Sequence, residues 1–191
     1  MYPELIDIST LFPPVDMNAI CQPNNPDYEF AKSIHQFHVR NLKGEFVKLD
    51  IYKGHVCIIV NIATQSGISA LQIKQFNELY DKYGEDKGLR ILAFPCNQFG
   101  SEQPGSSDDI AEFALQKNIT FDIFERVDVN GDNSSDFWNF LKVNGTNNMI
   151  KWSYNKFIVT KDGVPVERYG AEVEPQLTCL TELTTLIGRT W

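Results

Sequence analysis

Two long apolar runs dominate the pattern of hydrophobic and polar residues along this chain. Residues 55–63, HVCIIVNIA, and residues 89–96, LRILAFPC, are almost entirely apolar. Continuous apolar character over such a length is typical of strands that are buried on both faces of a sheet. Residues 69–84 between them repeat apolar side chains at helical spacing. A strand, a helix and a second strand in this order predict a parallel pair joined by a right-handed crossover.

The helix between the two runs carries signals at both ends. Ser69 and Gln72 have the spacing of a capping box, and Gly84 is suited to end the helix. We therefore predict that Ser69 caps the first turn. The apolar side that this pattern assigns to the core consists of Leu71, Ile73, Phe76, Leu79, Tyr80 and Tyr83.

Shorter patterns complete the fold. Residues 37–50 alternate around Lys43-Gly44, and residues 156–170 turn at Asp162-Gly163, so each segment predicts a β-hairpin. Further helices are predicted at residues 106–118, 134–145 and 174–188. Together these elements predict an α/β protein with a mixed central sheet flanked by helices and an N-terminal β-hairpin, which is the thioredoxin-like fold. Such sheets bind ligands beyond the carboxyl ends of their parallel strands.

The first 28 residues differ in composition from the rest. They hold five of the nine prolines and carry acidic but no basic side chains, which indicates little regular structure. We predict a flexible tail over residues 1–28 and one domain over residues 29–191. Such a tail is either a solvated linker or a segment that binds a protein partner, and the sequence leaves both open.

Charge and cysteine content narrow the class of protein. The formal net charge of −8 argues against nucleic-acid binding, and no apolar run reaches the length of a membrane span. The N-terminus lacks the pattern of a secretory signal and the arginines of a transit peptide, so we predict a cytoplasmic protein. Four cysteines without metal-binding spacing predict free thiols and no metal or cofactor: Cys21, Cys57, Cys96 and Cys179.

The turn after the first apolar run presents Ser66, followed by Gly67. This position, after a buried strand and before a helix, suits a nucleophile. It also suits a turn residue whose side chain binds free N–H groups at the start of the helix. A serine hydrolase would need a general base, and all three histidines precede the strand: His35, His38 and His55. The sequence therefore gives little support to a hydrolase.

Several motifs resemble those of the glutathione peroxidase family. FPCNQFG at residues 94–100, followed by Pro104 and Gly105, resembles the family signature. VNIATQSG at residues 60–67 resembles the active-site motif. VDVNG, IKWSYNKF and ERYG follow in the family's order, so the resemblance covers residues 33–175.

The resemblance is greatest to the phospholipid-hydroperoxide type, which implies a monomer. Tetrameric members carry an interface insertion, and the stretch between Phe137 and Trp152 is too short to hold it. The family reduces hydrogen peroxide or lipid hydroperoxides, with glutathione or thioredoxin as the reducing co-substrate. Some thioredoxin-dependent members carry a resolving cysteine in the helix that here spans residues 108–118, and this segment has none.

The resemblance also places four site residues. The cysteine or selenocysteine nucleophile of the family corresponds to Ser66. The family's glutamine corresponds to Glu102, with Gln103 beside it as though the order were exchanged. The tryptophan is retained as Trp152, whereas the asparagine after it is replaced by Ser153.

Two residues at or near this site each have two possible interpretations, and a third differs from the family. Cys96 is either a structural thiol at the end of its strand or a surrogate nucleophile. Trp152 either lines an open pocket or is an ordinary core or surface aromatic. Ile68 stands where the family often has a lysine.

Ser66 is incompatible with the chemistry of the family. A sulfur nucleophile attacks the O–O bond and becomes a sulfenic acid, which thiols reduce, whereas a serine oxygen has no stable equivalent state. Either Ser66 is a laboratory replacement that traps the enzyme, or the natural protein has lost its nucleophile. A laboratory replacement of the nucleophile would leave the hydrogen-bond donors of the site unchanged. The changes at Glu102 and Ser153 therefore favour natural divergence. We predict very low peroxidase turnover, with a non-catalytic binding or structural protein as the alternative.

Overall fold

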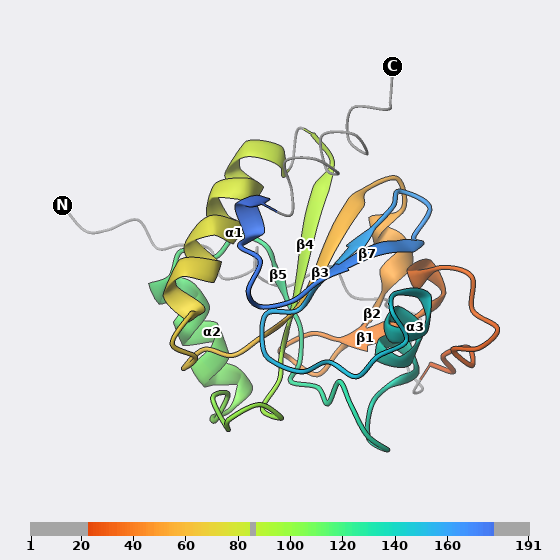
Figure 1. The fold of residues 1–191 in the computed structure, drawn as a ribbon, viewed down its shortest axis with the longest axis horizontal. Coiled ribbons are helices and arrows are strands. Elements are labelled where there is room, and N and C mark those ends of the chain that lie inside the picture. Colours follow the sequence, from red (N-terminus) through yellow and green to blue (C-terminus); the bar gives the residue numbers. More distant parts are fainter. Residues whose placement is uncertain (1–22, 85–86, 178–191) are drawn as a thin grey trace.

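The computed structural model describes residues 23–84 and 87–177 of the 191-residue chain and shows a layered α/β fold (Figure 1). Its central sheet consists of β3 (Val56–Ile62), β4 (Leu89–Pro95), β5 (Asp122–Ile123), β6 (Lys156–Val159) and β7 (Pro165–Tyr169). These strands lie in the order β5-β4-β3-β6-β7. The pairs β3–β4 and β4–β5 are parallel, and β6 and β7 are added antiparallel. The predicted mixed sheet is thus confirmed.

Helices and a small hairpin cover the two faces of this sheet. On one face lie α1 (Ser69–Tyr83) and α2 (Ser107–Gln116). On the other lie α3 (Asp136–Asn144), the hairpin of β1 (His38–Arg40) and β2 (Phe46–Lys48), and the short 3₁₀ helices η2 (Ile34–Gln36) and η3 (Leu49–Tyr52). In Figure 1, α1 and α2 stand to the left of the sheet, and the hairpin and α3 to its right.

The continuous apolar character of β3 follows from this double cover. Alternate side chains of a strand point to opposite faces of its sheet. Ile58 and Val60 therefore pack in the core beneath α1 and α2, whereas Cys57 and Ile59 pack in the core beneath α3 and the hairpin. Each core needs apolar residues, so no position in the middle of β3 is left for solvent.

The start of α1 differs from the prediction. The N-cap is Ile68, and no side chain caps this end of the helix. Ser69 instead donates its backbone N–H to the carbonyl of Ser66 at 2.9 Å. The predicted capping box was wrong because the turn after β3 is tight enough for the backbone to close it. Leu71, assigned to the core by its spacing, is 46% exposed.

The other predicted elements fare differently. Both hairpins are confirmed, and α2 begins with Ser106 and Asp109 in a capping box. The two-residue strand β5 was not predicted. The closing helix predicted at residues 174–188 lies, from residue 178 onward, outside the described residues, as do Cys21 and Cys179. Within the described ranges, no helix is long and apolar enough to cross a membrane.

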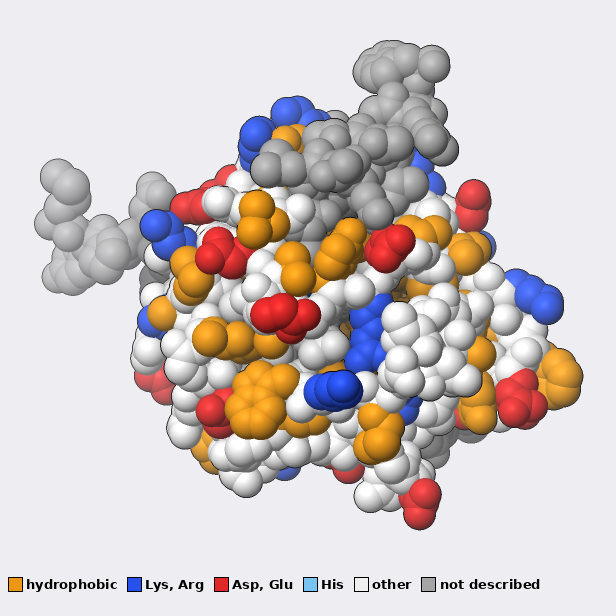
Figure 2. All heavy atoms as spheres, viewed as in Figure 1, with side chains coloured by type: hydrophobic (Ala, Val, Ile, Leu, Met, Phe, Trp, Pro, Cys, Tyr) orange, Lys and Arg blue, Asp and Glu red, His pale blue; other side chains and the backbone are white. Residues whose placement is uncertain are grey.

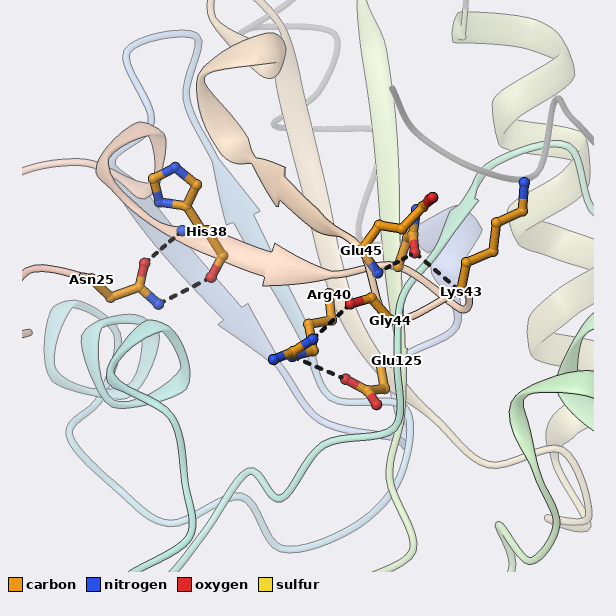
Figure 3. Close-up of polar contacts among 8 residues, drawn as sticks. Asn25, His38, Arg40, Lys43, Gly44, Glu45 and Glu125 are labelled. Carbon is orange, nitrogen blue, oxygen red and sulfur yellow. Dashed lines mark hydrogen bonds and ion pairs between the residues drawn. The ribbon is translucent and has the colours of Figure 1, made fainter. Parts of the chain in front are cut away.

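The segment before the domain is attached to the hairpin. The side-chain amide of Asn25 accepts the backbone N–H of His38 at 2.7 Å and donates to its carbonyl at 3.0 Å. Figure 3 shows this pair of bonds along the outer edge of β1. Residues 23–27 form no helix or strand, so a single side chain supplies the contacts that a neighbouring strand would make.

Candidate active site

Ser66 lies in the turn between β3 and α1, at the carboxyl end of the parallel strands. It is 7% exposed, and its backbone N–H donates to the carbonyl of Ala63 at 3.3 Å. The N-terminal end of α1 follows directly, and the positive end of a helix dipole favours an anion there. The setting is therefore one that would support a thiolate.

The loop that carries Glu102 lies against this turn. The carbonyl of Glu102 accepts the backbone N–H of Gln65 at 3.0 Å. Beside it, the side-chain oxygen of the buried Gln103 accepts the backbone N–H of Thr64 at 2.7 Å. The Gln103 side chain thus fixes the residues just before Ser66. The structure brings Glu102 and Ser66 onto adjoining segments, as the resemblance predicts.

A third loop, residues 152–155, completes the site. The Tyr154 hydroxyl donates to the carbonyl of Ala63 at 2.9 Å, which joins this loop to the turn before Ser66. The ring of Trp152 lies 6.3 Å from that of Phe99 and is 45% exposed. Trp152 is therefore partly exposed and borders an open depression of about 230 Å³, whereas its neighbour Ser153 is fully buried.

Tyr154 has an unusual backbone that this contact supports. Its φ of +64° lies in the left-handed region, which few residues other than glycine adopt. Burial raises the pKa of Tyr154 to about 12, with a smaller contribution from the negative charge of Glu102, although its interactions with the Ser69 hydroxyl and the Ala63 carbonyl oppose the shift. The hydroxyl therefore stays protonated and keeps its role as donor.

A hydrogen-bonded support lies beneath Trp152 and was not predicted from the sequence. The buried Asn61 of β3 donates to the carbonyl of Trp152 at 3.1 Å and accepts the backbone N–H of Asn155 at 2.9 Å. Asn155 donates to the same carbonyl at 2.9 Å. The Arg168 guanidinium in turn donates to the Asn155 side chain at 3.2 Å and to the carbonyl of Met149 at 3.0 Å. A polar residue inside the apolar run 55–63 is the one signal in the sequence that could have drawn attention to Asn61.

Two polar side-chain atoms around the site lack partners among the described residues. They are the hydroxyl oxygen of Ser153 and one carboxylate oxygen of Glu102, and both atoms are buried. An ionised carboxylate can only accept hydrogen bonds, and it disfavours a nearby anion. This half of the site is therefore poorly suited to stabilise a thiolate.

Two of the three histidines lie at the other end of the sheet from Ser66. His55 immediately precedes β3, and Ser66 follows its far end after a seven-residue strand. A strand of that length spans roughly 23 Å. His35 adjoins Gly163 in the β6–β7 turn, at the same end as His55. A pair of Ser66 with His35 or His55 is thus excluded. The third, His38, lies in β1 of the hairpin.

The two described cysteines are structural. Cys57 is fully buried in β3, and burial raises the pKa of its thiol to about 12. Cys96 is fully buried as well, burial raises the pKa of its thiol, and its N–H donates to the carbonyl of Ile62 at 2.9 Å. Neither thiol has the exposure or the electropositive surroundings of a reactive cysteine. The structural interpretation of Cys96 therefore holds.

Two depressions flank the site. One, of about 230 Å³, is bordered by Trp152, Lys151 and Arg168. Another, of about 490 Å³, is bordered by Gln65 and the exposed face of α2. In Figure 2, acidic and basic side chains are interspersed with hydrophobic ones on the face shown. Among residues 23–84 and 87–177, no three His, Cys, Asp or Glu side chains gather as a metal site requires.

Comparison with known proteins decides the family. A family model described as glutathione peroxidase matches residues 34–142, more than half of the chain. The chain belongs to the glutathione peroxidase family. The phospholipid hydroperoxide glutathione peroxidase of Callithrix jacchus is 45% identical over 156 residues, which cover 79% of each protein. That of Bos taurus is 44% identical over 154 residues, 78% of each. The predicted resemblance is confirmed.

Solved structures agree with this assignment. T. cruzi GPX1 is 31% identical with a TM-score of 0.66, over 82% of this chain and 97% of that one. The structure described as Trgpx in apo form is 25% identical with the same TM-score, over 83% and 98%. A thioredoxin family protein from Chlorobium tepidum shares only the fold, at 10% identity and a TM-score of 0.59, over 80% and 93%. The thioredoxin-like architecture is therefore confirmed.

Proposed function

We propose that this member of the glutathione peroxidase family has very low peroxidase turnover, because Ser66 occupies the nucleophile position. The position of Ser66 in the turn between β3 and α1, inside the segment that matches the family model, carries this proposal. Relatives named phospholipid hydroperoxide glutathione peroxidases support peroxides as the substrate class. Any remaining activity would reduce hydrogen peroxide or lipid hydroperoxides at the expense of glutathione or thioredoxin.

The chemistry fails at the first step. A thiolate attacks one peroxide oxygen, the O–O bond breaks, and the products are an alcohol and a sulfenic acid. Two reducing thiols then return the sulfenic acid to a thiol, with formation of a disulfide and water. Ser66 would have to form a hydroperoxide in place of a sulfenic acid, and that product remains an oxidant. Trp152, Glu102 and Ser153 cannot replace the missing sulfur.

Peroxide reduction by the purified full chain tests the proposal. Hydrogen peroxide and phosphatidylcholine hydroperoxide are offered with glutathione or with a thioredoxin system. We expect no turnover above background for the natural chain, and a peroxide-sensitive thiol in Ser66→Cys. Ser134→Cys, which adds a thiol away from this turn, is the matched control and should stay inactive. Brisk turnover by the unaltered chain would overturn the proposal, and Cys96→Ser would then identify the nucleophile.

A second candidate function is a non-catalytic binding or structural role. The two buried polar atoms of Glu102 and Ser153 without partners among the described residues favour it, because a site under demand for catalysis would use them. Residues 1–28 or the old active-site face would then contact a protein partner. If Ser66→Cys together with Glu102→Gln and Ser153→Asn is still inert towards peroxide, the site has lost its geometry and this function leads.

Two further properties belong to the proposal. A monomer follows from the short segment between α3 and Trp152, and sedimentation at micromolar concentration tests it, since a stable tetramer would contradict it. A cytoplasmic location is part of the same proposal. Imaging of the full chain with a C-terminal fluorescent tag tests that location.

A further inference from the structure

A lysine side chain is fully buried beneath the start of α1. Lys156 is the first residue of β6 and has no exposed surface. Alternate residues of a strand point to opposite faces of its sheet, and Ile158 packs in the core beneath α1 and α2. Lys156 therefore points into the same core. Lysine is almost never buried so completely unless its ammonium is paired.

The ammonium of Lys156 joins two of the segments that surround Ser66. Its Nζ donates to the carbonyl of Tyr154 at 2.8 Å and to the side-chain oxygen of Gln72 at 3.3 Å. Gln72 is 2% exposed and lies in α1, three residues after Ser69. The loop at residues 152–155 and the first turns of α1 are thus bound to one buried group.

Both segments contact the Ser66 turn directly. The hydroxyl of Tyr154 donates to the carbonyl of Ala63 at 2.9 Å and also interacts with the Ser69 hydroxyl. The backbone N–H of Ser69 donates to the carbonyl of Ser66 at 2.9 Å. Because three residues of a helix rise by about 4.5 Å, the ammonium of Lys156 lies on the order of 10 Å from residue 66.

The charge of Lys156 is the feature that calls for a function. Burial of an ammonium costs free energy, and a methionine of similar length would fill the same space without that cost. A positive charge favours a nearby thiolate, and salt screens a buried charge less than one at the surface. Glu102, on the neighbouring loop, acts in the opposite direction.

We propose that Lys156 is a positioning residue for position 66, whose buried ammonium holds α1 against the loop 152–155 and favours a negative charge on a side chain at position 66. The proposal rests on the proposed function only in taking position 66 as the family's nucleophile position. The hydrogen bonds of Lys156 serve the fold whether or not an anion forms. In the present chain its charge acts on a hydroxyl that does not ionise.

Titration of a thiol at position 66 tests the proposal on the full chain. The absorbance of thiolate at 240 nm is followed from about pH 4 to pH 11, and subtraction of the matched chain with Ser66 removes the other cysteines and the tyrosines. In the Ser66→Cys background, Lys156→Met should raise the pKa of the new thiol by about one unit. Gln72→Glu should raise it as well, because it places a carboxylate against the ammonium and keeps the volume of the side chain.

Lys82→Met is the matched control. It removes the same charge from an exposed position in the last turn of α1 and should leave the pKa of the thiol unchanged. If Lys156→Met does not fold, Gln72→Glu decides. An unchanged pKa in either folded variant, or an equal rise in Lys82→Met, overturns the proposal. A loss of stability without a shift of this pKa shows a merely structural lysine and overturns it too. The titration uses no peroxide, so its outcome is independent of turnover by the natural chain.

Discussion

Two regions on either side of Trp152 differ in how their polar groups are satisfied. Beneath it, Asn61, Asn155 and Arg168 form an interlocked set of hydrogen bonds to the backbone of the loop. Around Ser66, buried side-chain oxygens of Glu102 and Ser153 have no partner within the described residues. The hydrogen bonds beneath Trp152 are thus complete, whereas the polar groups at the two positions proposed to act on a thiolate are not.

This contrast distinguishes polar groups that are needed for folding from polar groups that are needed only for catalysis. Buried polar groups that hold a loop contribute to folding whether or not the site reacts. Groups that stabilise a reactive anion contribute only when the anion is present, so nothing in folding maintains them. Under the proposed loss of the nucleophile, the second set would be free to change, while the first would stay under the same demand as before.

The largest expected effect comes from restoring the groups that would stabilise a thiolate at position 66. In the Ser66→Cys background, Glu102→Gln and Ser153→Asn replace an acceptor and a short hydroxyl with amide donors. Losing a donor to a developing charge costs about 10²–10³ in rate, so the triple variant should exceed Ser66→Cys by about that factor. Stopped-flow measurement of thiol oxidation by hydrogen peroxide gives both rate constants. Equal rates would mean that these two positions no longer face the sulfur.

The next largest effect is expected when the hydrogen bonds beneath Trp152 are removed. Asn61→Ala removes two hydrogen bonds from a fully buried residue and leaves the N–H of Asn155 unpaired. We expect the free energy of unfolding to fall by about 2–3 kcal/mol, measured by urea denaturation. Asn139→Ala, which removes one bond from a half-buried residue of α3, is the control and should cost about 0.5 kcal/mol. If both variants lose a similar free energy of unfolding, the hydrogen bonds beneath Trp152 contribute no more than an ordinary bond on α3.

The buried carboxyl of Asp122 has a hydrogen-bond partner, in contrast to the carboxylate oxygen of Glu102 that has none among the described residues. Asp122 accepts the Tyr52 hydroxyl at 2.7 Å, and burial raises the pKa of Asp122 from 3.8 to about 6. The native state thus binds this proton more tightly than the unfolded chain. Its contribution to stability is present below about pH 4 and is lost as the pH rises to about 6.

Asp122→Asn should remove this loss while keeping an acceptor for Tyr52. We expect the variant to gain about 2 kcal/mol relative to the natural chain between pH 4 and pH 7. Urea denaturation across this range measures the difference, which cancels the contributions of the other acids. A constant difference would show that the carboxyl keeps its ordinary pKa in the folded protein.

The smallest effect should have the opposite sign. Ser153→Ala removes a buried hydroxyl that has no partner among the described residues, so we expect stability to rise by about 0.5 kcal/mol. Ser106→Ala removes a working helix cap from α2 and should cost about 1 kcal/mol. Thermal unfolding of the two variants side by side checks the signs. A loss of stability in Ser153→Ala would show that its hydroxyl has found a partner.

Much of the fold could be predicted from local patterns. The runs that became β3 and β4 are long enough to identify without their neighbours, and Gly44 and Gly163 mark turns with positive φ. The strand β5 has only two residues, so no periodicity marks it, and it exists through its pairing with β4. The cap of α1 was predicted wrongly because side-chain spacing does not reveal how tightly the preceding backbone turns.

The site residues Ser66, Glu102, Trp152 and Ser153 were assigned from the resemblance of motifs, and their roles stay predictions. The structure does bring together the loops that hold them. The hydrogen bonds beneath Trp152 could not be predicted from the sequence, because the bond between Asn61 and Asn155 joins residues 94 positions apart. Whether the oxygens of Glu102 and Ser153 find partners depends on packing around each atom, which no pattern of residue types specifies.

The bond between Asn25 and His38 has a consequence for how molecules of this protein meet one another. The outward N–H and C=O groups of a two-stranded ribbon invite another strand, and exposed edges of this kind lead to aggregation. On β1 the outward groups of His38 are taken by Asn25, and the carbonyl of Arg40 accepts the N–H of Glu125. Asn25 lies outside the segment that matches the family model. A residue before the conserved domain thus closes its edge against self-association, and the solubility of truncated forms will depend on whether they keep it.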